Sequence, residues 1–131
     1  ENTDNPYGVQ FSQLHAVELV DIDGDGLKDI LTGKTYRAHD FGDEGARQAP
    51  VIYYFRLTRD DDGTVEFIPH MIDDQAGIGR QLVSGDLNGD GLVDFVVGNK
   101  NGAFAFTQKV RKVSQEEWQA AQPVRIENFG D

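Results

Sequence analysis

The sequence predicts an all-β fold made of two copies of one unit, and three observations support this prediction. The segment 21–33 recurs as 86–98, 65 positions later in a chain of 131 residues. Short runs rich in β-branched and aromatic residues flank both copies of the segment. The chain also contains 15 glycines, which suits many short strands joined by turns.

The first unit is expected to span residues 1–72 and to contain four strands. Its strand-like runs are 16–20, 29–32, 51–58 and 64–68, and a hairpin turn at 59–63 joins the last two. Between the second and third runs lies a polar insertion at 34–50. A loop of this length is uncommon in a compact repeat and is often functional.

The second unit is expected to span residues 73–131. Three strand-like runs occupy 81–85, 94–97 and 103–107, and a tight turn at 99–102 stands where the first unit has its long insertion. Ser114 and Glu117 have capping-box spacing, which predicts a short helix near 114–121. Residues 123–126 are expected to supply the fourth strand. Four strands per unit match the blade of a β-propeller.

Composition excludes several classes of function. Lys and Arg number 12 against 23 Asp and Glu, a net charge of −11 that disfavours nucleic acid and anionic membrane surfaces. No apolar run approaches 18 residues, so no membrane insertion is expected. The absence of cysteine excludes disulfides, cysteine-bound metals and thiol catalysis. Ser12, Ser84 and Ser114 lack a nucleophile elbow, and no pair of carboxylates is singled out, so we expect no enzyme.

The repeated acidic segment has the spacing of a calcium loop. Side-chain oxygens at positions 1, 3, 5 and 9 and a backbone carbonyl at position 7 can surround one hard cation, and glycine at position 6 permits the turn. Oxygen donors of this kind favour Ca²⁺ over zinc or copper. We therefore predict two Ca²⁺ sites, with the following ligands: Asp21, Asp23, Asp25, the Leu27 carbonyl and Asp29 in the first, and Asp86, Asn88, Asp90, the Leu92 carbonyl and Asp94 in the second.

The alternative is a pair of Asp/Gly-rich hairpin turns that bind no metal. Two copies with donors at matched positions argue against this alternative. The first site offers four carboxylates and the second three, because Asn88 stands at position 3. We therefore expect the first site to bind Ca²⁺ more tightly.

The flanking residues separate three families that use such a loop. An EF-hand or dockerin needs an acidic residue at position 12, where this chain has Thr32 and Val97. Thrombospondin-type repeats would bring cysteines. A strand, a DxDxDGxxD loop, a second strand and a glycine resemble FG-GAP repeats, also described as VCBS repeats, which are blades of integrin α-subunit propellers. The name-giving Phe-Gly element is blurred; residues 7–9 and 77–79 lie roughly where it belongs.

This resemblance implies two four-stranded propeller blades, each with its calcium loop between the first and second strands. It implies a calcium-stabilised module, secreted, at the cell surface or periplasmic, that recognises or scaffolds a protein or carbohydrate ligand. Two alternatives are a lectin-like propeller and the accessory blades of a larger secreted hydrolase or lyase. Further blades are expected from the same chain or from a homo-oligomer, and the start at Glu1 without Met favours an excised fragment.

A ligand site is expected on the face opposite the calcium loops. In an up-and-down blade the insertion 34–50 and the connection 73–77 share that face. Its ligand-binding candidates are Arg37, His39, Asp40 and Asp43. A second metal or sugar site, formed by His39, His70, Asp73 and Asp74, is weighed against ordinary solvated loop residues. Trp118 and the aromatic run 53–55 are expected to pack in the core or between blades rather than to stack on a sugar.

Overall fold

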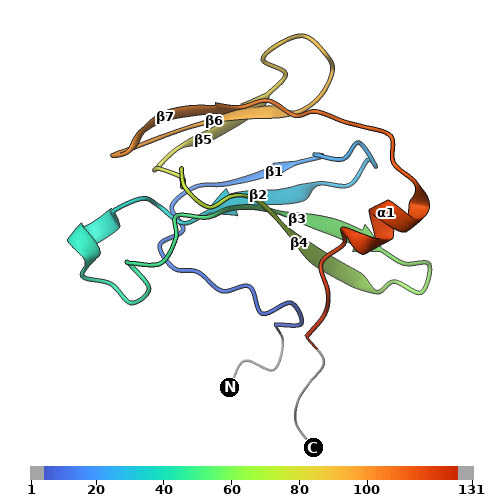
Figure 1. The fold of residues 1–131 in the computed structure, drawn as a ribbon, viewed down its shortest axis with the longest axis horizontal. Helices are drawn as coiled ribbons and strands as arrows, with labels where there is room; N and C mark the ends of the chain where they lie inside the picture. The colour runs from blue at the N-terminus through green and yellow to red at the C-terminus, as the bar shows by residue number, and fades with distance from the viewer. Residues whose placement is uncertain (1–4, 127–131) are drawn as a thin grey trace, which may run out of the picture.

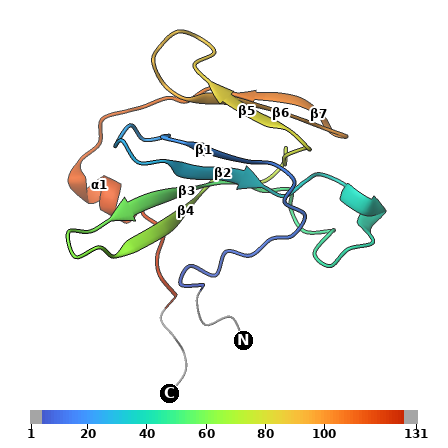
Figure 2. The same cartoon turned by 180° about the vertical axis from the view of Figure 1, so that it is seen from behind.

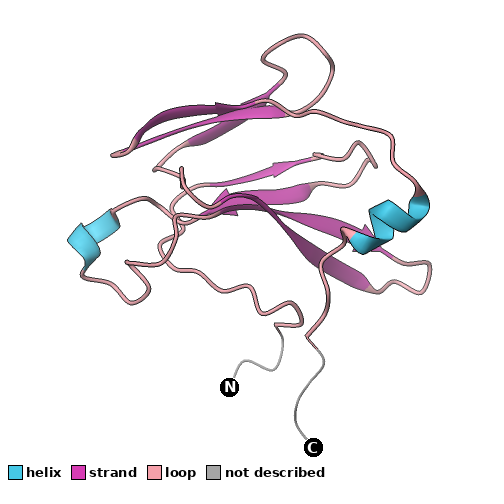
Figure 3. Ribbon diagram, viewed as in Figure 1, coloured by secondary structure: helices cyan, strands magenta, loops and turns pink. Residues whose placement is uncertain are grey.

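The computed structural model describes residues 5–126, which form two antiparallel sheets and one short α-helix (Figure 3). The first sheet has the order β1-β2-β3-β4 and the second the order β5-β6-β7. The elements are β1 (Val17–Val20), β2 (Asp29–Gly33), the 3-10 helix η1 (Ala38–Phe41), β3 (Ile52–Arg59), β4 (Val65–Asp73), β5 (Leu82–Gly85), β6 (Asp94–Asn99), β7 (Gly102–Phe106) and α1 (Gln115–Ala120). No helix among the described residues is long and apolar enough to cross a membrane.

The two sheets lie one above the other and share a hydrophobic core (Figures 1 and 2). Alternate residues of a strand point to opposite faces, so one face of each sheet can meet the other sheet. The first sheet contributes Leu31 and Ile52, and the second contributes Leu82, Phe95 and Val97. Ile78, in the connection between the sheets, is also fully buried in this core.

Several local predictions are confirmed. Each predicted strand of the first sheet is present within a few residues, and the acidic segments join β1 to β2 and β5 to β6. The Ser114 hydroxyl accepts a hydrogen bond from the Glu117 N–H at 3.1 Å and caps α1. Glu117 itself forms an ion pair with Arg111 at 2.6 Å.

The prediction of a fourth strand in the second unit, at residues 123–126, is wrong. Residues 123–126 have no regular structure, and the second sheet has three strands. After β7 the chain runs past the end of the first sheet to α1, and it then approaches the N-terminal segment rather than returning to β7 (Figure 1). The Ile126 N–H donates to the Pro6 carbonyl at 2.7 Å.

Two further expectations need correction. β4 continues to Asp73 instead of ending near 68, because Pro69 lies in an edge strand, where a missing N–H is tolerated. Trp118 is not in the core: it is 47% exposed, and the Arg56 guanidinium lies 5.8 Å from the centroid of its ring. The run 53–55 does pack, with Tyr53 stacked between Phe11 and Phe55.

Candidate metal centre and ligand cleft

Asp21 builds the turn of the first acidic loop. Its Oδ1 accepts from the N–H groups of Gly24 at 2.8 Å and Asp25 at 3.1 Å, and its Oδ2 accepts from Gly26 at 2.9 Å. Gly24 and Gly26 have φ angles of 78° and 90°, which a residue with a Cβ atom adopts only with strain. One carboxylate thus organises the whole turn before any metal is considered.

Asp29 attaches this loop to the sheet. Its side chain is completely buried, with Oδ2 accepting from the Ile22 N–H at 3.0 Å and Oδ1 from the Leu57 N–H at 2.8 Å. Leu57 belongs to β3, so the last residue of the motif connects the loop to two neighbouring strands. These bonds satisfy both carboxylate oxygens while leaving lone pairs for a cation.

Three carboxylates of the first loop come together. One oxygen atom each of Asp21, Asp23 and Asp29 can be chosen so that all lie within 4.8 Å of one another. Burial raises the pKa of Asp23, and the neighbouring carboxylates of Asp25 and Asp29 add to the effect. The nearest protein cation is Arg56, whose Nη1 lies 3.9 Å from Asp23 Oδ2. A divalent cation would relieve the repulsion that this geometry concentrates.

Asp25, the predicted position-5 ligand, lies outside this group of three. Its Oδ1 accepts from the N–H of Leu27 at 2.8 Å. The structure therefore brings together three of the four predicted carboxylates of the first site.

The second loop repeats the hydrogen bonds of the first. Asp86 accepts from Gly89, Asp90 and Gly91, and these bonds lower the pKa of Asp86, the bond from Gly91 most strongly. Asp94 is completely buried and accepts from Leu87 at 2.9 Å and Gln108 at 2.8 Å.

The second loop lacks a matching acidic cluster. Within residues 5–126, no second group of three carboxylates converges. Asn88 occupies the position of Asp23, and its amide donates to Asp90 Oδ2 at 3.0 Å, which draws that oxygen into the turn. Asp90 also accepts from the Leu92 N–H at 2.9 Å. The two loops thus share one backbone design but differ in charge.

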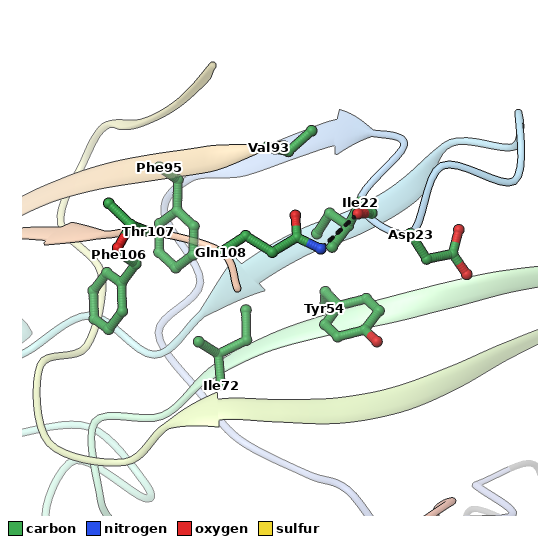
Figure 4. Close-up of a pocket in the computed structure, with 9 residues that line it drawn as sticks. All are labelled: Ile22, Asp23, Tyr54, Ile72, Val93, Phe95, Phe106, Thr107 and Gln108. Carbon is green, nitrogen blue, oxygen red and sulfur yellow. Dashed lines mark hydrogen bonds between the residues drawn. The ribbon is translucent and has the colours of Figure 1, made fainter. Parts of the chain in front are cut away.

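The residues of the first loop fit a calcium ion. All their side-chain donors are carboxylate oxygens, which a hard cation prefers. Backbone N–H groups that donate to Asp21 hold the turn on which these donors lie. A small cavity of about 210 Å³ adjoins Asp23 between the sheets, with an apolar lining that includes Tyr54, Phe95 and Phe106 (Figure 4).

The predicted ligand-binding residues lie at the opposite end of the sheets. Arg37 and His39 line a cleft of about 460 Å³. Asp40 is almost fully exposed, and its Oδ1 lies 3.8 Å from Lys100 Nζ. Asp43 Oδ2 lies 2.5 Å from His39 Nδ1. Hydrogen bonds from Gln13 and then from His39 lower the pKa of Asp43.

As a metal site, the suggested convergence of His39, His70, Asp73 and Asp74 is not formed within the described chain, where no metal-ligand group contains any of them. His70 stacks on Tyr54 at 4.8 Å between ring centroids, near Arg56. Asp73 instead forms a turn by accepting from Gln75 and Ala76. The register of the sheet places His70 several residues before the strand end, and this separates it from the insertion.

Sequence reasoning missed several residues that line the same cleft, four of which matter most for its charge and polarity. They are His15, Thr35, Arg80 and Lys100. His15 and Arg80 lie just before the first strand of each sheet, and Thr35 and Lys100 lie just after the second strand of each sheet. All four are therefore at the ends of the strands opposite the acidic loops. That position in the chain is the signal that would have identified them.

Comparison with known proteins identifies one family. A family model described as an FG-GAP-like repeat matches residues 21–97, more than half of the chain. No match was found among curated proteins or among solved structures.

Proposed function

The chain belongs to the FG-GAP-like repeat family, and from this premise we propose that it is a calcium-stabilised pair of β-propeller blades that serves recognition outside the cell. In this proposal each sheet is one blade, and the second blade obtains its fourth strand from elsewhere. The metal is structural: it neutralises the acidic loop and fixes the angle between the first two strands of the blade.

The arrangement of the sheet faces supports a propeller. Leu31 and Tyr54 belong to the face of the first sheet that meets the second. The counterpart of Leu31 in the second unit is Val96, 65 positions later. The counterpart of Tyr54 is Ala105, only 51 positions later, because the second unit lacks the insertion. Both counterparts lie on the outer, partly exposed face of the second sheet. Each sheet can therefore pack against the next in the same direction, which is how blades follow one another around a ring.

The acidic cluster carries the calcium part of the proposal. Asp21, Asp23 and Asp29 would hold the ion, with Asp25 and the Leu27 carbonyl completing the motif as the family resemblance implies. Bound Ca²⁺ would supply charge neutralisation and no chemistry. Extracellular modules function with dissociation constants on the order of 10⁻⁴–10⁻³ M, because calcium is plentiful there.

A reciprocal exchange between the loops tests this role. Asp23→Asn gives the first loop the donor set of the second, and Asn88→Asp does the reverse. An Asn at position 23 can still accept the 3.2 Å hydrogen bond from the Asp25 N–H, so the turn is preserved. Isothermal titration and thermal melts should show weaker calcium binding for Asp23→Asn and stronger binding for Asn88→Asp.

Saturating calcium should raise the melting temperature of the unchanged protein. A ligand at 100-fold excess over Kd that binds only the native state contributes about 2.7 kcal/mol per site. Melting curves that coincide in calcium and in chelator would overturn the calcium role. If neither exchange changed the calcium affinity of its loop, the prediction that the first loop binds calcium more tightly than the second would be overturned.

A further inference from the structure

The cleft opposite the acidic loops is formed by segments that are distant in the sequence. The backbone of the insertion is hydrogen-bonded to the connection between the sheets. The Tyr36 N–H donates to the Ile78 carbonyl at 3.2 Å, and the Ile78 N–H donates to the Lys34 carbonyl at 3.0 Å. Gly98 and Lys100, at the end of β6, close the other side. The cleft of about 460 Å³ therefore draws its walls from both sheets.

The cleft concentrates positive charge in an acidic protein. Arg37, Arg80 and Lys100 line it, together with His15 and His39, whereas the whole chain carries a net charge of −11. Asp40 lies beside Lys100 and Asp43 beside His39, both outside the lining. Within residues 5–126, Arg80 forms no ion pair. A quarter of the protein's 12 basic side chains thus surround one hollow.

Thr35 also lines the cleft, and its hydroxyl is buried. Its residue is only 8% exposed, and its hydroxyl has no hydrogen-bond partner among the described residues. A buried hydroxyl without a partner costs on the order of 1–3 kcal/mol. Because the backbone N–H of Thr35 is bonded to the Gln13 carbonyl at 3.0 Å, its main chain is fixed at the wall of the cleft. The hydroxyl oxygen is inaccessible to solvent, so a ligand in the cleft could reach Thr35 only through its other atoms.

The basic wall is preorganised by its backbone and by aromatic contacts. Arg37, His39 and Asp40 all have φ angles near +50°, a conformation that residues other than glycine rarely adopt. The Arg37 guanidinium lies 5.1 Å from the Phe41 ring centroid, and the Lys100 ammonium donates to the Arg37 carbonyl at 3.1 Å. Strained residues of this kind cluster at binding sites.

We propose that this cleft binds the oxyanion group of a small ligand, with Arg37, Arg80 and Lys100 supplying charge. The inference deepens the recognition role proposed above and rests on it for its biological meaning. Guanidinium groups match the geometry of carboxylate, sulfate and phosphate, which share the chemistry required here.

The test measures binding of D-glucuronate, sulfate and inorganic phosphate by NMR titration, with D-glucose as the uncharged control. At low salt at least one anion should bind saturably, and D-glucose should not. Preference for glucuronate would assign a carboxylate ligand, and preference for sulfate or phosphate an inorganic or esterified one. Equal binding of glucuronate and glucose, or no saturable binding by any anion, would overturn the proposal.

One variant and one control localise the binding. Arg80→Gln should weaken it about tenfold, since hydrogen bonds to charged groups contribute most strongly. Arg59→Gln, an exposed arginine at the far end of β3, should leave it unchanged. Equal losses in Arg80→Gln and Arg59→Gln would overturn the site.

The outcome is separable from the calcium proposal. The segments that line the cleft, 35–39 and 98–100, lie at the ends of the strands opposite the acidic loops (Figure 1). Anion binding that persists in a protein without a calcium response would leave the cleft assignment standing. A normal calcium response without anion binding would overturn only the cleft.

Discussion

At the scale of single residues, position 9 of the acidic loop has a structural role as well as a charge. Asp29 and Asp94 are both completely buried, and each accepts two backbone N–H groups, one from the loop and one from β3 or the residues after β7. Hydrogen bonds to charged groups are stronger than those between neutral groups. These carboxylates therefore attach the loops to their sheets through hydrogen bonds.

His70 is the residue whose environment predicts a pH response. Its ring is stacked on Tyr54, and its Nε2 is buried without a partner among the described residues. Burial lowers the pKa of His70 below its usual value of 6.5, and the nearby Arg56 guanidinium lowers it further. The folded protein therefore prefers the neutral ring.

The stability contributed by neutral His70 should be lost at mildly acidic pH. As the pH falls below 6.5, the unfolded chain takes up the proton first, so stability decreases until the pH reaches the lower, folded-state pKa. Urea unfolding at pH 7.5 and pH 5.5 should show a smaller loss for His70→Phe, which retains the stacking and cannot titrate. An equal loss in both proteins would contradict this assignment.

At the scale of elements, the insertion after β2 distinguishes the two units. Lys34 at its start is buried, and its ammonium donates to Gln13 Oε1 at 2.6 Å and to the Ala46 carbonyl at 3.3 Å. In the second unit the corresponding residue is Asn99, whose amide donates to the carbonyls of residues 76–78. Two different side chains thus fasten the same end of the sheets.

Replacing residues 34–51 with the turn 99–102 separates the functions of the two ends. The exchange removes Thr35, Arg37 and His39 from the cleft but leaves the acidic loop in place. We expect a lower melting temperature, because the bonds between the insertion and Ile78 are lost, but the same increase on adding calcium. Anion binding should disappear. The melts and the NMR titration described above provide both measurements.

Two results would contradict this prediction. A chimera that keeps full anion affinity would show that the insertion does not form the site. A folded chimera that loses its calcium response would show that the insertion supports the acidic loop, despite its place at the opposite end of the strands.

At the scale of the whole molecule, both outer sheet faces are exposed and apolar. Leu19 is 61% exposed on the outer face of the first sheet, and Val83 is 57% exposed on that of the second. Exposed apolar faces drive association. Because the two faces differ, contact between copies would be head-to-tail rather than symmetric.

We therefore predict that the isolated chain associates at micromolar concentration. Light scattering should give an average mass above that of the monomer, and Leu19→Glu and Val83→Glu should each reduce it. Val110→Glu is the matched control, since Val110 is 71% exposed in a segment outside both sheets. A stable calcium-bound monomer would mean that some other two-repeat β fold replaces the propeller.

The sequence by itself determined the repeat, the acidic turns and the seven strands that the described chain contains, although not the full length of β4. These features depend on neighbouring residues: alternation sets a strand, and Asp and Gly at fixed spacings set the turn that Asp21 organises. The same spacing aligns Asn88 with Asp23, so the sequence also predicted the difference in charge between the two loops.

Only the tertiary structure decided how distant segments meet. Residues 123–126 have a strand-like composition, yet α1 directs them to the N-terminal segment and β7 remains an edge. His70 lies within β4 and pairs with Tyr54, which separates it from the insertion that carries His39. Thr35 and Arg80, by contrast, come from different connections and line one cleft. Contacts of this kind depend on packing between the sheets, which no local pattern encodes.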